Sequence, residues 1–375
     1  MNSRLSLSLS FAMLGACGGT FPGNTSDAVA TYAQIAEASY ADSISTAETL
    51  DAALQALVDD PSAANLTAAQ QAWLDSREPY LQTEVYRFYD GPIDNPTDGP
   101  EGLLNAWPLD ENYIDYVVGD PDAGIVNGTE TIDGATLEGL NEAGGEKNIA
   151  TGYHAVEFLL WGQDLSETGP GERPATDYVT DGSGTAANQD RRGLYLTVTG
   201  DLIIQHLTQV HDAWTPEAAY RTGFEGDPEG SFEDILTGMI VLAGFETGGE
   251  RLQASLDAGD QEEEHSCFSD NTHRDMIQDV QGILNVWTGT YEAIAGTGVR
   301  DVVERLDSDL ASELDAQIQE SLDLANALQP PYDQEIAPGS EGNARVAALV
   351  TSLRTTEDLL SDAFALLELT PEIPE

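Results

Sequence analysis

Apolar residues recur every three or four positions along several long stretches of this 375-residue chain. This spacing runs through an alanine-rich segment and at least three others, at 27–58, 186–214, 231–256 and 301–328. It places apolar side chains on one face of an α-helix, where they can pack against other helices. No segment has the convincing alternation of apolar and polar residues that is typical of strands. We therefore expect an all-α protein with a bundle architecture.

The two halves of the chain resemble one another faintly. Trp73 begins the segment WLDSREPYLQTE in the first half, and Trp287 begins WTGTYEAIAG in the second. Clusters of glycine, proline and aspartate separate the helical stretches and indicate loops. Two similar helical bundles related by duplication would fit this faint pseudo-repeat, an N-terminal bundle over 27–190 and a C-terminal bundle over 191–375.

Acidic residues dominate the charge, with 67 Asp and Glu against 14 Lys and Arg and a net charge of -53. Such a surface repels nucleic acid and anionic lipid headgroups, so nucleic acid is excluded as a partner. Three interpretations remain: adaptation to a saline habitat, a surface that collects cations, or acidic tails. The acids are spread along the whole chain and Lys147 is the only lysine. Salt adaptation is therefore favoured, and the same field would concentrate cations near any site.

The N-terminus has the features of an export signal. One positive charge, Arg4, precedes a short apolar stretch that ends in Leu-Gly-Ala before Cys17. We expect a signal peptide over 1–16 and a lipidated tether over 17–26, since small residues before a cysteine resemble the bacterial lipobox. An ordinary signal peptide with an incidental cysteine is the alternative. Gly18 after the cysteine favours the outer membrane, facing the periplasm or the cell surface, with lipid as the only membrane contact.

The segment GYHAVEFLLWGQD places His154 and Glu157 three residues apart in an apolar helical run. Side chains at this spacing are neighbours on one helix face, so the pair could hold one metal ion. The alternative is a buried histidine whose hydrogen bonds are met within the core. Position 158 is Phe, so the second histidine of a zinc-protease pattern is missing.

A second group of candidate ligands lies in the segment EEEHSCFSDNTHRD, residues 262–275. It mixes metal-ligating residue types with turn-forming residues, and the candidates are His265, Asp270 and His273. Cys267 lies in the same segment and is expected to be a buried thiol, a ligand or a redox-sensitive residue. A solvated acidic loop is the alternative interpretation.

Charged residues also stand among aromatic ones in the segment QTEVYRFYDGPID. Buried charges must be paired, so Glu84 and Arg87 either form a structural ion pair or Glu84 joins a site. Glu246 and Glu250 flank two glycines and are either site residues or surface acids.

These residues together resemble the imelysin-like proteins, peptidase family M75. The family hallmark Gly-x-His-x-x-Glu is present as Gly152, His154 and Glu157, and the segment from 263 to 275 resembles the iron-regulated branch. The resemblance covers essentially the whole mature chain. It implies a helical two-bundle fold with a site where the halves meet, and an exported protein linked to iron uptake, often a lipoprotein.

Three functions follow as alternatives. The favoured one is a lipoprotein that binds a divalent metal ion, with iron preferred and zinc or manganese as alternatives, and that works with metal-transport partner proteins. Its expected ligands are His154 and Glu157, joined by others from Glu84, His265, Asp270 and His273. The second is a zinc peptidase in which Glu157 would be the catalytic base, although no complete catalytic zinc site is evident. The third is a protein that binds a peptide or partner and no metal.

Overall fold

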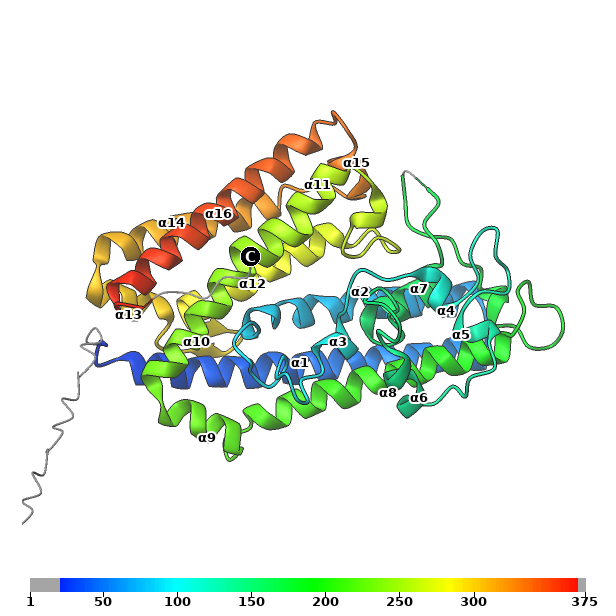
Figure 1. The fold of residues 1–375 in the computed structure, drawn as a ribbon, viewed down its shortest axis with the longest axis horizontal. Coiled ribbons are helices and arrows are strands. Elements are labelled where there is room, and N and C mark those ends of the chain that lie inside the picture. Colours follow the sequence, from blue (N-terminus) through cyan, green and yellow to red (C-terminus); the bar gives the residue numbers. More distant parts are fainter. Residues whose placement is uncertain (1–20, 167, 370–375) are drawn as a thin grey trace, which may run out of the picture.

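A computed structural model describes residues 21–166 and 168–369 of the chain (Figure 1). The described part is mostly helical, as expected, and the all-α fold class is confirmed. Its exception is an antiparallel hairpin of β1 (Thr290–Tyr291) and β2 (Ile294–Ala295).

The first half contains two long helices, a set of short ones, the buried helix α7 and the long helix α8. Their bounds are α1 (Thr25–Asp59), α2 (Ala63–Leu81), η1 (Glu84–Tyr86), α3 (Glu101–Leu104), α4 (Glu111–Ile114), α5 (Gly124–Asn127), α6 (Gly134–Leu140), α7 (Gly152–Trp161), η2 (Ala175–Tyr178) and α8 (Gln189–Trp214).

The described second half contains five helical elements of 13 or more residues and several shorter ones. Their bounds are α9 (Ala219–Gly226), α10 (Pro228–Ile240), η3 (Val241–Gln253), α11 (Ala254–Ala258), η4 (Gln261–Glu263), α12 (Thr272–Thr288), α13 (Val299–Leu306), α14 (Ser308–Ala325), α15 (Asp333–Ile336) and α16 (Gly342–Leu366).

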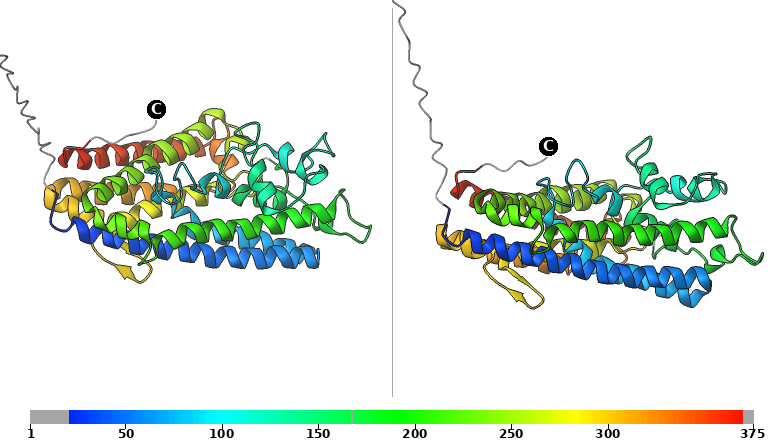
Figure 2. Two further views of the ribbon diagram at one scale, coloured as in Figure 1. Left: turned by 60° about the horizontal axis from the view of Figure 1, so that its bottom comes forward. Right: turned by 90° about the horizontal axis from the view of Figure 1, so that it is seen from below.

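The helices pack in two groups. In the first group α1 lies against α2 and α8, and α7 lies between α2 and α8 (Figures 1 and 2). In the second, α16 packs against α14 and η3, and α12 packs against α14. Helix α10 contacts both α1 and α16, and α12 contacts α2, so the two groups meet along these helices.

The expected division of the chain between residues 190 and 191 falls at the start of α8. Because α8 packs against α1 and α7, the first group of helices extends to Trp214. The domain division therefore stays a prediction, as does the pseudo-repeat. Trp73 and Trp287 are both fully buried, on α2 and α12 respectively.

Two expected single helices are interrupted. The stretch 301–328 breaks at Asp307, whose extended backbone ends α13 and whose carboxylate accepts hydrogen bonds from the first backbone amides of α14. The stretch 231–256 runs through α10 and α11, but its middle, η3, is a π-helix. π-Helical turns are rare and often occur at functional sites. This one carries Arg251, whose buried guanidinium donates a hydrogen bond to Glu84.

The expected signal peptide and Cys17 lie outside the described residues. Within the expected tether, Phe21 packs edge-on against Phe232 and α1 already begins at Thr25. Among the helices that the structure describes, none combines the length and apolar character needed to cross a membrane.

Candidate metal centre

Helix α7 presents the His-x-x-Glu motif from the middle of the core. All ten of its residues are buried. Gly152 begins the helix with a φ of +85°, and a Cβ there would lie 2.5 Å from the carbonyl oxygen of Leu104. Only glycine tolerates both this backbone conformation and this close approach. The glycine of the motif thus sets the position of α7 against α3.

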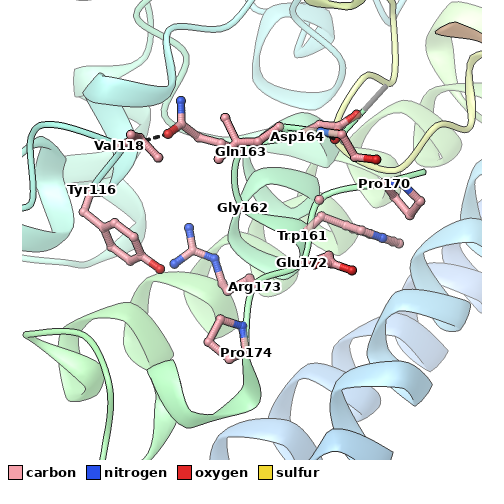
Figure 3. Close-up of a pocket in the computed structure, with 13 residues that line it drawn as sticks. Tyr116, Val118, Trp161, Gly162, Gln163, Asp164, Pro170, Glu172, Arg173 and Pro174 are labelled. Atoms are coloured by element: carbon pink, nitrogen blue, oxygen red, sulfur yellow. Dashed lines mark hydrogen bonds between the residues drawn. The ribbon is translucent and has the colours of Figure 1, made fainter. Parts of the chain in front are cut away.

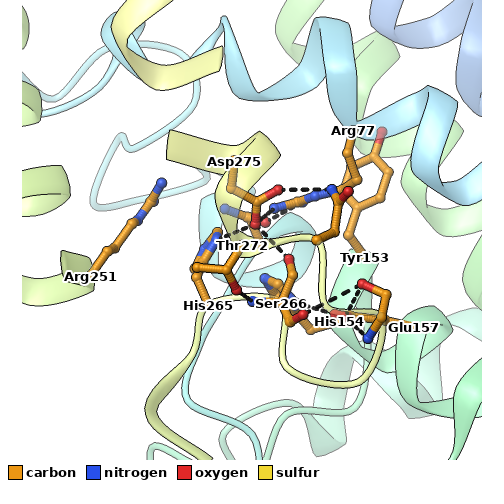
Figure 4. A network of polar contacts seen from close by, with 12 residues as sticks. Arg77, Tyr153, His154, Glu157, Arg251, His265, Ser266, Thr272 and Asp275 are labelled. Atoms are coloured by element: carbon orange, nitrogen blue, oxygen red, sulfur yellow. Dashed lines mark hydrogen bonds and ion pairs between the residues drawn. The ribbon is translucent and has the colours of Figure 1, made fainter. Parts of the chain in front are cut away.

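The two motif side chains contact each other directly (Figure 4). His154 Nδ1 lies 2.8 Å from Glu157 Oε2, and both residues are at most 1% exposed. Glu157 Oε1 accepts hydrogen bonds from the Ser269 backbone amide at 3.0 Å and from its hydroxyl at 2.6 Å. His154 Nε2 is buried without any hydrogen-bond partner. The pair is therefore satisfied on the Nδ1 side and free on the other.

Burial controls the protonation of this pair. It raises the pKa of Glu157 to about 8, although the Ser269 hydroxyl opposes the shift. It lowers the pKa of His154 well below its usual value, and the neighbouring His265 adds to this effect. When Glu157 is ionised, the neutral ring of His154 carries its proton on Nδ1, and Nε2 offers a lone pair.

A second histidine–carboxylate pair lies beside the first. His265 Nδ1 is 2.7 Å from Asp275 Oδ2, and the His154 and His265 ring centroids are 4.8 Å apart. Asp275 also accepts hydrogen bonds from the Ser266 hydroxyl and from Arg77. Burial, followed by the nearby Arg251 and Arg77, lowers the pKa of His265, so this ring is neutral as well.

Arg77 supplies the positive charge behind Asp275. Its guanidinium is fully buried and lies within 5.5 Å of the ring centroids of Trp73, Tyr80 and Tyr153. It also donates to Asn105 Oδ1 at 2.6 Å. The aromatic rings fix the guanidinium by cation–π contacts, so a positive charge is held beside Asp275.

Glu84 belongs to an adjacent arginine network. Its Oε2 accepts from Arg87 and from Arg251, each at 2.6 Å, and Arg251 also bonds Asp279 and Glu246. Burial opposes the charged form of Glu84, but the two arginines outweigh it and lower its pKa to about 2. Glu84 is thus an ionised partner of two arginines.

A pocket of about 460 Å³ opens toward His265. Trp107 lines it and lies with its ring centroid 5.0 Å from that of His154. The rest of its lining is mainly charged, with Arg87, Arg251, Glu101, Glu142, Glu246, Glu250 and Glu263. This pocket gives His265 a route to solvent, and Trp107 separates the pocket from His154.

Another hollow, of about 340 Å³, lies over the C-terminal end of α7, near Trp161 and Arg173 (Figure 3). Arg173 donates to Asp115 at 2.8 Å and lies 3.4 Å from Asp177. Its charge is already paired, which makes this hollow a weaker candidate site.

Of the residues that the sequence pointed to, the structure brings together His154, Glu157 and His265. Asp270 and His273 lie in the same segment but take other partners. The Asp270 carboxylate lies beside Asp164 and Asp333, and His273 Nδ1 is 3.2 Å from the Asp270 carbonyl oxygen. Cys267 is a buried free thiol, and burial raises its pKa well above the usual value.

Several contributing residues were missed in the sequence. Ser269 and Asp275 lie within the segment 262–275, but nothing there marked Ser269 as a donor to Glu157 or Asp275 as the carboxylate behind His265. Arg77 and Trp107 lie far from the motif in sequence. The one available indication of Arg77 was its position between Trp73 and Tyr80 in a chain with only 14 basic residues.

Fold and centre together define a class: an all-helical protein with two neutral histidines, each backed by a carboxylate, buried near the contact between its two helix groups. The model of the imelysin family, peptidase M75, matches residues 36–360, and the chain belongs to this family.

Two relatives are named for iron regulation. The chain is similar to the iron-regulated protein A of Synechococcus elongatus, with 24% identity over 353 residues that cover 93% of this chain and 88% of the relative. It is also similar to the solved structure of an iron-regulated protein A precursor from Parabacteroides distasonis. That match has a TM-score of 0.66 and 18% identity, covers 92% of this chain and 97% of the other, and supports the fold alone.

Proposed function

We propose that this protein binds a divalent metal ion, with iron favoured, through His154 and His265. The observation that carries the proposal is the buried, unpartnered Nε2 of His154 beside a second histidine held in the same way. Metal-ligating histidines typically donate their other ring N–H to a carboxylate, which fixes the tautomer and raises the basicity of the ligating nitrogen. Both histidines here have such a carboxylate.

This proposal changes the roles expected from the sequence. Glu157 and Asp275 act from behind the rings, where they orient the histidines and balance the ion's charge. Glu84 would not be a metal ligand, because its Oε2 already accepts hydrogen bonds from Arg87 and Arg251. It would affect the centre only through the charge of these arginines. The remaining ligands would come from water or a small chelating molecule that enters through the pocket at His265. Nitrogen and oxygen ligands of this kind suit iron, manganese and zinc.

The link to iron uptake and the cellular location belong to the same proposal. A relative carries the name iron-regulated protein A, which describes that protein. The segment before Cys17 has the features of a lipoprotein signal. Together they support an exported protein anchored by lipid at the outer membrane, which captures metal and passes it to transport partner proteins.

The peptidase alternative is less well supported by the geometry. Cleavage requires an extended peptide to reach the metal, and a third protein ligand. His154 is 1% exposed behind Trp107 and His265, a position suited to a small ion. We therefore favour binding over hydrolysis.

Calorimetry tests this proposal. The purified protein is stripped of metal and titrated with Fe²⁺, Mn²⁺ and Zn²⁺. Excess Ca²⁺ is present throughout, so that it occupies any site made of oxygen ligands alone. We expect one site that His154→Ala removes and that Glu157→Gln weakens by about 10- to 100-fold, the usual effect of losing an outer carboxylate. His211→Ala is the matched control, because His211 is half-buried on α8 beside Asp212 and remote from the centre. Binding that survives His154→Ala unchanged would contradict the proposal.

A further inference from the structure

Three buried aspartates from distant parts of the chain meet beside the histidine centre. Asp164 follows α7, Asp270 lies in the segment 262–275, and Asp333 begins α15. One oxygen of each lies within 4.8 Å of the other two, and the residues are 4%, 6% and 7% exposed. The fold thus brings three carboxylates into one small volume away from bulk water.

Glu264 adds a fourth carboxylate. It is fully buried, and neither of its oxygens meets a donor in hydrogen-bonding geometry. Burial and the adjacent Asp333 carboxyl both raise its pKa, and the Thr272 hydroxyl only partly opposes them. Its side chain therefore faces the aspartates as an unpartnered acid.

These four acids differ from the neighbouring buried acids in having no basic partner in the described part of the chain. Asp275 and Asp279 are equally buried, yet each has an arginine, Arg77 and Arg251 respectively. In the cluster, both oxygens of Asp270 and both of Asp333 lack a partner, and so does Asp164 Oδ2. The hydrogen bond that the cluster does receive comes from the Ser166 amide to Asp164 Oδ1, at 2.9 Å. Buried charges of one sign need a counter-charge, and no described arginine or lysine forms an ion pair here.

The same repulsion acts on the protonation of the aspartates. Burial, with the neighbouring acids, raises the pKa of Asp164 to about 6 and that of Asp270 to about 7. Without a bound cation, Asp164 and Asp270 therefore hold their protons to a higher pH than ordinary aspartates do.

We propose that Asp164, Asp270, Asp333 and Glu264 form a site for a hard divalent cation of the Ca²⁺ class, separate from the histidine centre. Oxygen is the only donor type present, and Ca²⁺ takes six to eight oxygen ligands with flexible geometry. Softer ions such as Zn²⁺ prefer nitrogen and sulfur, which the two histidines offer and this cluster lacks.

A path from solvent to the cluster exists. A pocket of about 590 Å³ is lined by Asp164 and Asp333 and has Asp260 and Glu262 along its wall. Water can complete the coordination through this pocket, and its acidic lining attracts cations.

The cation would tie together three segments, two of which, the end of α7 and the segment 262–275, also form the histidine centre. Glu264 and Asp270 alternate along the chain with His265, Ser269 and Asp275, which contact His154, Glu157 and Arg77 respectively. Fixing the acidic side of this segment therefore fixes its histidine side. We expect Ca²⁺ to act as a structural ion that holds half of the other site in place.

The test uses the full chain, stripped with a chelator and titrated with Ca²⁺ by calorimetry, together with its thermal unfolding midpoint. We expect one Ca²⁺ per chain and a higher midpoint when it binds. Asp333→Asn and Asp270→Asn should each weaken binding by roughly tenfold or more, because each removes one charged ligand. Asp257→Asn, an exposed acid on α11 with the same charge change, should bind as the wild type does.

The midpoint without Ca²⁺ distinguishes a lost site from a damaged fold. Since Asp333→Asn relieves repulsion, its metal-free midpoint should equal or exceed that of the wild type, while the rise with Ca²⁺ becomes smaller. His154→Ala should retain Ca²⁺ binding, which separates this proposal from the histidine centre. Absence of binding by the wild type, or equal binding by wild type, Asp333→Asn and Asp270→Asn, would overturn it.

Discussion

Carboxylates of the same kind behave differently in this core because their partners differ. Asp275 has Arg77 behind it, whereas Glu157 has only the neutral donors of Ser269 and the ring of His154. The charge of Glu157 is therefore the less compensated, in keeping with its pKa of about 8. A cation at His154 would favour the ionised form of Glu157, so metal binding and loss of this proton are linked.

Glu84 tests the importance of the arginine network. Glu84→Gln removes the charge shared by Arg87 and Arg251, which leaves two buried guanidinium groups less compensated. We expect a loss of about 3 kcal/mol in the free energy of unfolding, measured with urea. Glu246→Gln removes a more exposed partner of Arg251 and should cost less than about 1 kcal/mol. Equal effects of the two variants would contradict this assignment.

The contribution of Glu111 to the free energy of unfolding depends on pH. Burial raises its pKa from 4.5 to about 7, although Gln163 donates a hydrogen bond to it. The folded state thus holds this proton more tightly than the unfolded chain, and the contribution of Glu111 to stability falls as pH rises from about 4.5 to 7.

The variant Glu111→Gln does not titrate and can still accept from Gln163. Allowing for the partial exposure of the group, we expect it to exceed wild type by about 1 kcal/mol at pH 8 and to match it at pH 4. Urea unfolding at both pH values measures the difference. A larger gain at pH 4 than at pH 8 would reverse the sign and refute the argument.

At the scale of elements, the short helix α7 and the segment 262–275 build the centre together. Hydrophobic spacing predicts the long helices well, because each buries a continuous face. It fails where a side-chain cap or a backbone contact determines where a helix ends or how it is wound, as at Asp307 and in the π-helix η3. The motif on α7 was visible in the sequence, but the orientation of segment 262–275 depends on contacts with Glu157 and Arg77 from distant residues. The sequence therefore predicted the pair of segments and not the roles of their side chains.

Gly152 connects the motif to the packing of α7. Gly152→Ala places a Cβ 2.5 Å from the Leu104 carbonyl oxygen and imposes a left-handed backbone on alanine. We expect a loss of about 2 kcal/mol or more in stability. Gly223→Ala is the control: Gly223 is in helix α9 with open space around it, so alanine should stabilise by up to about 1 kcal/mol. Chemical denaturation compares the two, and a neutral Gly152→Ala would show that this contact is not needed.

The whole molecule carries a net charge of -53 on a fold that has few cations to offset it. The amino-acid composition alone predicts this net charge. The sites depend on which of the 67 acids meet in space. Asp164 and Asp333 are 169 positions apart and nothing in their local sequence marks them, so their cluster could be found only in the folded structure.

Screening should stabilise such a molecule. Raising NaCl from 0.05 M to 1 M shortens the range of repulsion between surface carboxylates, so we expect the unfolding midpoint to rise by roughly 5 °C or more. Sucrose at equal osmolality is the control for general exclusion effects, and chelator in all samples removes the contribution of bound Ca²⁺. A midpoint independent of salt would argue against salt adaptation as the reason for the acidic surface.

The most direct test of the central claim is a crystal structure of the protein soaked with Fe²⁺ under anaerobic conditions, with anomalous scattering recorded at the iron edge. Binding by the two histidines predicts one iron peak at coordination distance, about 2.1 Å, from Nε2 of both His154 and His265. Glu157 and Asp275 should stay on the Nδ1 atoms of these rings. An empty centre in crystals whose iron lies elsewhere, or a peak bound by neither histidine, would contradict it.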